Sequence, residues 1–174
     1  MKYIPAVLFS ASLLLLYSSP LSAEERSALN HRKTVPLTFN DPENNIGPTM
    51  PKGSISIRID NIRNTEGILG IALFSSKAGF PDQTEKAFAL ASVETGESLR
   101  EVVIENIPYG IYALSVLHDE NGNRKMDKTW IGKPKEGFGT SNNPKIRFGP
   151  PEFDESGFVL DRETVNMTID IKYL

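Results

Sequence analysis

Residues 54–62 read SISIRIDNI, and this short stretch decides the fold class. Ile55, Ile57 and Ile59 alternate with serine, arginine and aspartate residues. A period of two places one set of side chains on a core and the other set toward solvent. The sequence therefore predicts a β-strand with one buried face at this position.

Similar short segments follow along the rest of the chain. Strands are predicted at ILGIALFSS (68–76), LREVVIENI (99–107), IYALSVLHD (111–119), FDESGFVL (153–160) and ETVNMTIDIKYL (163–174). The segment EKAFALASV (85–93) fits either a short helix or another strand. About seven short strands without a long amphipathic helix indicate an all-β sandwich or barrel, and we favour an antiparallel β-sandwich.

The first 23 residues have the order of a secretory signal peptide. Lys2 precedes an apolar run over residues 6–17, and small residues lead to Ala23. The alternative is a membrane anchor, but a spanning helix needs about 20 apolar residues and this run is shorter. We therefore expect cleavage after Ala23, no membrane span afterwards, and a periplasmic or secreted protein.

Composition limits what the exported chain can be. It has no cysteine, so its stability depends on a packed core or a bound ion rather than on disulfides. Residues 24–53 are rich in proline, asparagine and charge and are predicted to form a flexible arm, in which VPLTF could add an edge strand. Residues 54–174 form the predicted sandwich domain. The net charge of −3 argues against nucleic-acid binding, which needs a basic surface.

An acidic loop after the strand at 111–119 has the spacing of a calcium loop. Asp119, Asn121 and Asn123 fall at alternate positions, Lys125 is placed to offer its backbone carbonyl, and Asp127 follows. Calcium takes six to eight oxygen ligands, and loops of this kind present them at alternate positions. The pattern predicts a weak calcium site, with a dissociation constant of about 10⁻⁴–10⁻³ M.

The match to the helix-flanked calcium loop is partial. Arg124 stands where that loop has glycine, and Trp130 stands where it has a bidentate glutamate. Glu120 or Glu136 would have to supply further oxygens. The competing interpretation is a plain hairpin turn, because Asn-Gly at 121–122 is a strong two-residue turn signal.

The segment 132–151 contains four glycines and four prolines, which predicts a long loop without regular structure. Long loops are often functional, and aromatic and amide side chains suit a sugar or an anionic group. The candidate ligand-binding residues are Phe138, Asn142, Asn143, Arg147 and Phe148. The alternative is a lid held over one end of the sandwich by its two phenylalanines.

Catalysis is a second possibility. His118, Asp119 and Glu136 are candidate acid–base groups for a cell-envelope hydrolase. Zinc lacks ligands, because the only other histidine, His31, lies in the predicted arm and no cysteine is present.

A non-enzymatic binding or structural module that meets an envelope or extracellular partner is the leading hypothesis. A module that assembles through its strand edges is a third.

Three blocks, LHDENGNRKMD (117–127), GKPKEGFGTSNN (132–143) and RFGPPEFDESGF (147–158), give the chain a family resemblance. With IPYGIYAL before them, they resemble a family of exported bacterial proteins known as domain of unknown function 2141. The resemblance covers about residues 55–174 and implies a small sandwich of the transthyretin-like kind. The strand entry is similar to that of carboxypeptidase regulatory-like modules. The family pattern has glycine at Arg124.

Overall fold

The structure is a computed structural model of the whole chain, and it describes residues 22–23, 31–40, 50–96, 99, 101–145 and 149–174. The predicted signal peptide, apart from Ser22 and Ala23, lies outside the described residues. So do residues 24–30 and 41–49 of the predicted arm. Among the described residues, no helix has the length and apolar character needed to cross a bilayer.

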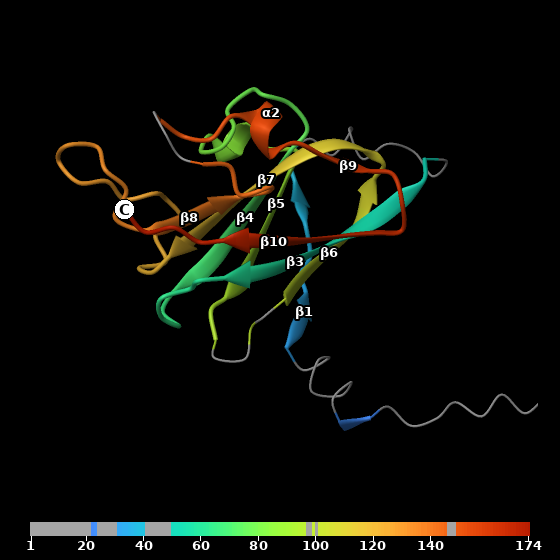
Figure 1. The fold of residues 1–174 in the computed structure, drawn as a ribbon, viewed down its shortest axis with the longest axis horizontal. Helices are drawn as coiled ribbons and strands as arrows, with labels where there is room; N and C mark the ends of the chain where they lie inside the picture. The colour runs from blue at the N-terminus through green and yellow to red at the C-terminus, as the bar shows by residue number, and fades with distance from the viewer. Residues whose placement is uncertain (1–21, 24–30, 41–49, 97–98, 100, 146–148) are drawn as a thin grey trace, which may run out of the picture.

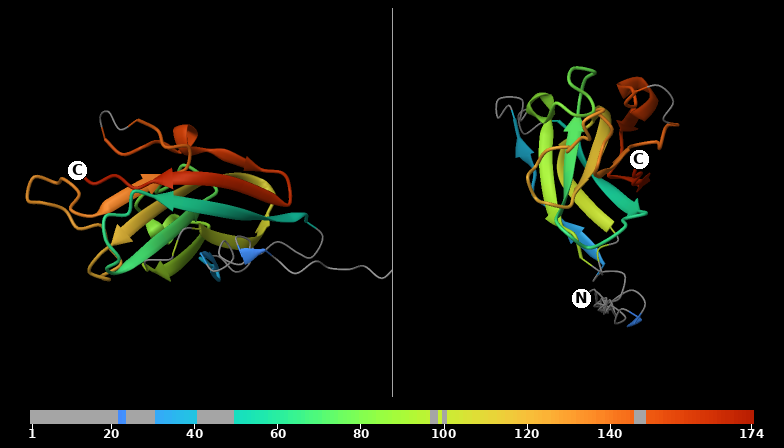
Figure 2. Two further views of the ribbon diagram at one scale, coloured as in Figure 1. Left: turned by 60° about the horizontal axis from the view of Figure 1, so that its bottom comes forward. Right: turned by 90° about the vertical axis from the view of Figure 1, so that its left-hand side faces the viewer.

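The described residues form two β-sheets that pack against each other (Figure 1; Figure 2). One sheet has the order β1-β6-β3-β10, and the other has the order β2-β5-β4-β7-β8, with β9 paired to β7. The strands are β1 Arg32–Thr34, β2 Thr38–Phe39, β3 Lys52–Asp60, β4 Ile68–Phe74, β5 Ala89–Glu94, β6 Glu101–Pro108, β7 Gly110–Asp119, β8 Gly137–Thr140, β9 Phe158–Leu160 and β10 Thr164–Asp170. The all-β prediction is confirmed.

The core lies between the sheets and follows the alternation of the sequence. Ile55, Ile57 and Ile59 of β3 are buried in one cluster with Leu69 of β4 and Leu114 of β7. Each fully buried aliphatic side chain of this kind stabilises the fold by about 1.5–3 kcal/mol. The burial of the three isoleucines is therefore the main reason that this face of β3 turns inward.

A smaller cluster covers the outer face of the second sheet. Phe74 of β4 packs on Phe80, and Phe80 packs edge-to-face on Phe153 with ring centroids 5.8 Å apart. Phe153 begins the short helix α2 Phe153–Ser156 (Figure 1), and the 3-10 turn η2 Thr84–Lys86 follows Phe80 in the chain. This outer layer explains why β4 is apolar on both faces.

Strand pairing is mixed rather than purely antiparallel. β10 runs parallel to β3, and β1 runs parallel to β6. The predicted arm is also partly inside the fold, because β1 and β2 come from it and extend one sheet each. Val35, between those two strands, is buried in the core and anchors this part of the arm. The segment VPLTF does add a strand, and β3 begins two residues earlier than expected.

Three local predictions need correction. EKAFALASV contains both proposed structures, because η2 occupies its start and β5 follows. FDESGFVL is a helical turn before strand β9, since Glu152 and Glu155 form a capping box at the N-terminus of α2. The segment 132–151 is not free of regular structure, because β8 lies within it and pairs with β7. Gly137 and Gly139 permit that strand, since a Cβ at either would meet Ile171 or Ile169 side-chain atoms at 2.5–2.6 Å.

Candidate metal centre

Asp119 and Glu136 sit at the two ends of the connection between β7 and β8. The antiparallel register pairs His118 with Gly137, so one step further along the ladder sets Asp119 opposite Glu136. The intervening segment projects beyond the ends of the sheets, at the left of Figure 1 near the C-terminus. The hairpin register thus brings two carboxylates 17 positions apart in the sequence to the base of one loop.

The loop curls around the side chain of Asp119, which is 1% exposed. Its Oδ1 accepts a hydrogen bond from the backbone N–H of Asn123 at 3.2 Å, and its Oδ2 accepts one from Arg124 at 2.5 Å. Arg124 has φ of 61°, the left-handed conformation that a calcium loop gives to glycine. The bend therefore forms despite the arginine, at a cost of about 1–2 kcal/mol.

Asn121 and Asn123 complete the inner ring of the loop. Each Oδ1 accepts a hydrogen bond from the backbone N–H two residues later, at 3.0 Å and 2.8 Å. Each Nδ2 donates to Oδ2 of Asp127, at 2.7 Å and 3.1 Å. The polar side chains of the predicted site therefore lie in one connected network. The acceptor oxygens of Asn121 and Asn123 each keep a second lone pair, whereas Oδ2 of Asp127 already accepts two hydrogen bonds.

Glu136 is the one member of this group with an unsatisfied atom. The residue is 3% exposed, and its Oε2 accepts a hydrogen bond from the backbone N–H of Asp127 at 3.0 Å. Its Oε1 is buried and, as an ionised oxygen, has no donor to accept from. Burial raises the pKa of Glu136, the carboxylates of Asp119 and Asp127 raise it further, and a side-chain hydrogen bond that protonated Glu136 donates to Asp119 raises it as well. A buried carboxylate without a cationic partner is unfavourable, so the site is short of positive charge.

The local cations do not supply that charge. Within the described part of the chain, no ion pair involves Asp119, Asp127 or Glu136. The described residues also contain no ready-made group of three His, Cys, Asp or Glu side chains with metal-binding geometry. Metal binding would therefore have to use the amide and backbone oxygens of the loop together with the carboxylates, as calcium allows.

Glu120, the other candidate for an additional ligand, is committed elsewhere. It forms a bidentate ion pair with Arg63, and the side-chain amide of Asn64 also donates a hydrogen bond to it. Hydrogen bonding to Arg63 lowers the pKa of Glu120. Of the two glutamates that the sequence suggested, only Glu136 has an oxygen left for a cation.

His118 is fully buried and engaged at both ring nitrogens. Its Nε2 lies 2.9 Å from the carbonyl oxygen of Glu66, and its Nδ1 lies 2.6 Å from the hydroxyl of Tyr173. A carbonyl only accepts, so Nε2 carries a proton and donates it. The guanidinium of Arg63 lies 4.3 Å from the centre of the Tyr173 ring. His118 thus ties the C-terminal tyrosine to the sheet.

The predicted ligand-binding loop is divided by the structure. Phe138 is a half-buried residue of β8. Asn142 donates to the carbonyl of Gly157 at 2.7 Å, and Asn143 bonds both Thr168 and Asp170 of β10. The amides are therefore engaged in holding the loop to the fold. Arg147 and Phe148 lie outside the described residues.

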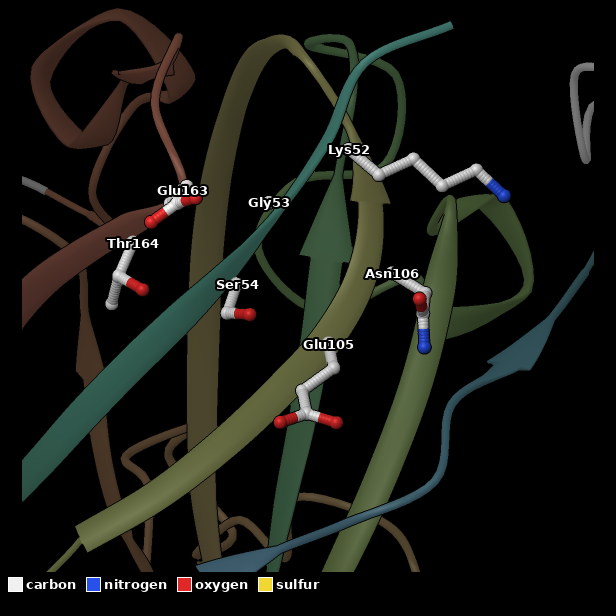
Figure 3. Close-up of a pocket in the computed structure, with 7 residues that line it drawn as sticks. All are labelled: Lys52, Gly53, Ser54, Glu105, Asn106, Glu163 and Thr164. Carbon is white, nitrogen blue, oxygen red and sulfur yellow. The ribbon is translucent and has the colours of Figure 1, made fainter. Parts of the chain in front are cut away.

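A separate surface hollow of about 360 Å³ lies at the Lys52 end of β3. Figure 3 shows that the side chain of Lys52 points away from those of Glu105 and Asn106, so the three do not meet at one point. The remaining lining residues are Gly53, Ser54, Glu163 and Thr164. This hollow is open and has no convergent polar groups.

Residues 57–168 match a family model described as an uncharacterized protein conserved in bacteria, DUF2141. The chain belongs to this family. The matched range runs from β3 into β10 and includes every residue of the candidate metal centre. No curated protein and no solved structure matches this DUF2141 chain.

The sequence suggested Glu136 as one of two additional ligands for the loop of this DUF2141 protein, but it did not predict the strand register that sets Glu136 opposite Asp119. That pairing depends on β8, and a stretch rich in glycine and proline hides a strand. The signal that could have found it is the GFGT run at 137–140, flanked by a single glutamate and following an acidic loop.

Proposed function

We propose that the protein is an exported, non-enzymatic β-sandwich module that binds a calcium ion weakly in the segment 119–136. The observation that carries the proposal is the buried, unpartnered Oε1 of Glu136 beside the carboxylates of Asp119 and Asp127. A cation held by the amide and backbone oxygens of the loop together with the nearest carboxylate oxygens would offset the negative charge gathered there. The proposed ligands are Asp119, Asn121, Asn123, Asp127, Glu136 and the backbone carbonyl of Lys125.

Calcium suits this arrangement better than magnesium. The oxygens come from the loop after β7 and from Glu136, the residue that precedes β8, and they mix carboxylate, amide and backbone types. Calcium accepts six to eight such ligands in irregular geometry, whereas magnesium needs a small, nearly ideal octahedron. We therefore expect calcium to bind more tightly than magnesium.

The ion would act as a structural clamp. Asp127 and Glu136 already meet through one hydrogen bond of 3.0 Å, and a shared cation would hold their carboxylates together as well. That contact fixes the start of the 132–151 segment against the end of β7. In this proposal calcium orders the segment that the module presents to an envelope or extracellular partner.

The second candidate function, a cell-envelope hydrolase that uses His118, Asp119 and Glu136, has less support. Both ring nitrogens of His118 are bonded to protein groups, and the side chain is fully buried. A general base must reach the proton it removes. His118 would have to break two hydrogen bonds before it could act on a substrate.

The proposal also includes export of the protein and the type of sandwich that it forms. The signal-peptide order of residues 1–23 supports a periplasmic or secreted location. The turn at Pro108 and Gly110, which opens β7, supports a sandwich of the transthyretin-like or carboxypeptidase regulatory-like kind. N-terminal sequencing of the protein recovered from a bacterial host tests the first point, since it should begin at Glu24.

Thermal unfolding with and without calcium tests the metal. With a dissociation constant of about 0.1–1 mM, calcium at about 10 mM adds about 1.4–2.7 kcal/mol to the free energy of unfolding. The melting temperature should then rise by about 4–10 °C relative to chelator. Asp127→Asn should remove most of this rise.

Asp161→Asn is the matched control, because Asp161 is exposed and pairs only with its neighbour Arg162 among the described residues. The control changes the net charge equally but leaves the site intact, so it should keep the full rise. Equal melting temperatures of the unaltered protein in calcium and in chelator would refute the proposal.

A further inference from the structure

The apex of the loop carries the most exposed aromatic residue of the described chain. We call residues 127–136 the tip hairpin. At its apex Trp130 is 97% exposed and the adjacent Ile131 is 65% exposed. Trp130 is also the only tryptophan in the sequence. Two large apolar side chains in water at one point mark an interaction surface rather than a core.

The tip hairpin is an ordered turn. Lys135 donates its backbone N–H to the carbonyl of Asp127 at 2.9 Å, and Thr129 donates to Lys133 at 2.7 Å. These two hydrogen bonds pair Lys128 with Pro134 as an antiparallel bridge. Below them, the hydrogen bond from Asp127 to Glu136 closes the base. A braced turn presents its apex without the loss of entropy that ordering a free loop would require.

The tip hairpin and the residues just before it carry a net positive charge. Residues 124–136 contain five lysines and arginines and two acidic residues, Asp127 and Glu136, whereas the whole chain has a net charge of −3. All five basic side chains, Arg124, Lys125, Lys128, Lys133 and Lys135, are exposed. This segregation of charge on an acidic protein indicates an anionic partner.

We propose that the tip hairpin docks on an anionic lipid surface. Trp130 and Ile131 enter the boundary between headgroups and acyl chains, and Lys128 and Lys133 contact the lipid phosphates. Tryptophan and lysine are the side chains that favour this boundary, tryptophan for its amphipathic ring and lysine because its stem can stay apolar while its ammonium reaches the headgroups. A convex apex also fits a soft interface, which needs no complementary pocket.

Two weak contributions to membrane affinity, charge attraction and apolar burial, combine in the tip hairpin. Each basic residue close to a charged membrane adds about fivefold to partitioning, and two buried apolar side chains add further. The docking stands on the tip hairpin alone and does not depend on the proposed metal. A failure of the melting experiment with calcium therefore leaves it untouched.

The fluorescence of Trp130 tests the proposal directly, because it is the only tryptophan of the full chain and reports the tip hairpin alone. Other parts of the chain that associate with vesicles do not change this signal. With vesicles containing phosphatidylglycerol, its emission should shift to shorter wavelength and be quenched by brominated acyl chains. Neither change should occur with phosphatidylcholine vesicles or with inorganic phosphate.

Two pairs of variants sharpen the test. Lys128→Gln with Lys133→Gln should weaken partitioning about 25-fold, and Lys52→Gln with Lys86→Gln, two lysines outside the tip hairpin, should leave it nearly unchanged. Ile131→Ser should also weaken partitioning, whereas Ile111→Ser, an exposed isoleucine of β7, should not. No emission shift with anionic vesicles, or the same shift with both vesicle types, overturns the proposal and leaves a protein partner for the apex.

Discussion

The backbone N–H of Asp127 donates to Oε2 of Glu136 at 3.0 Å, which joins the acidic loop after β7 to the first turn before β8. The other oxygen of Glu136 has no partner and is shielded from solvent. One carboxyl group therefore both closes the tip hairpin and leaves an unbalanced charge at its base.

Glu136→Gln should stabilise the protein in chelator. The amide keeps an oxygen for the Asp127 N–H and replaces a buried charge with a neutral group of the same shape. We expect an increase of about 1–3 kcal/mol in the free energy of unfolding, measured by urea denaturation near neutral pH. A large loss of stability instead would mean that the carboxylate has a strong partner in the folded protein.

The pH dependence of stability should show the same group. Because the pKa of Glu136 is raised in the folded protein, the folded state keeps a proton that the unfolded state has already lost. The contribution of Glu136 to stability is therefore fully present below the unfolded carboxyl pKa of about 4.3 and is lost as pH rises through the raised folded value. The difference between the unaltered protein and Glu136→Gln, measured in chelator across this range, isolates the effect. A flat difference would contradict the assignment.

Arg124→Gly should stabilise the loop by about 1 kcal/mol, since Arg124 occupies a left-handed conformation that glycine adopts without strain. Lys125→Gly is the matched control at the next position, where the backbone is not left-handed. That control should be neutral or slightly destabilising. Chemical denaturation of the two variants measures both changes in the free energy of unfolding. Equal changes would show that the backbone of Arg124 is not strained.

Tyr173→Phe should destabilise the protein by about 1–2 kcal/mol. The change removes the hydroxyl that bonds Nδ1 of His118 and accepts from the Arg63 N–H, and it leaves a buried ring nitrogen unpaired. The melting shift caused by calcium should persist, because Tyr173 is not a proposed ligand. Loss of that shift in Tyr173→Phe would mean that the metal centre extends to the C-terminus.

Alternation in the sequence is enough to predict the sheet core. Ile55, Ile57 and Ile59 are buried as a period of two requires, and Tyr112, Leu114 and Val116 of β7 face the same core. The members of the acidic loop are also predictable, because ligand spacing is a local property. Parallel pairing of β10 with β3 is not, since it depends on where the chain crosses between the sheets.

From the sequence, Glu136 could be named as one of two possible ligands but could not be chosen over Glu120. Glu120 and Glu136 are equally plausible ligands until Arg63, 57 positions from Glu120, is seen to pair with it. The strand β8, which buries Glu136, lies in a stretch whose glycines and prolines predict only a loop. Those glycines serve close packing against β10 instead of flexibility.

Calorimetric titration of the unaltered protein and of Glu136→Gln with calcium tests the central claim most directly. We expect the unaltered protein to bind one calcium ion with a dissociation constant of about 0.1–1 mM, and the variant to bind at least tenfold more weakly. Titration with magnesium should give a smaller signal. Absence of calcium binding to the unaltered protein, or equal binding by the variant, would contradict the account.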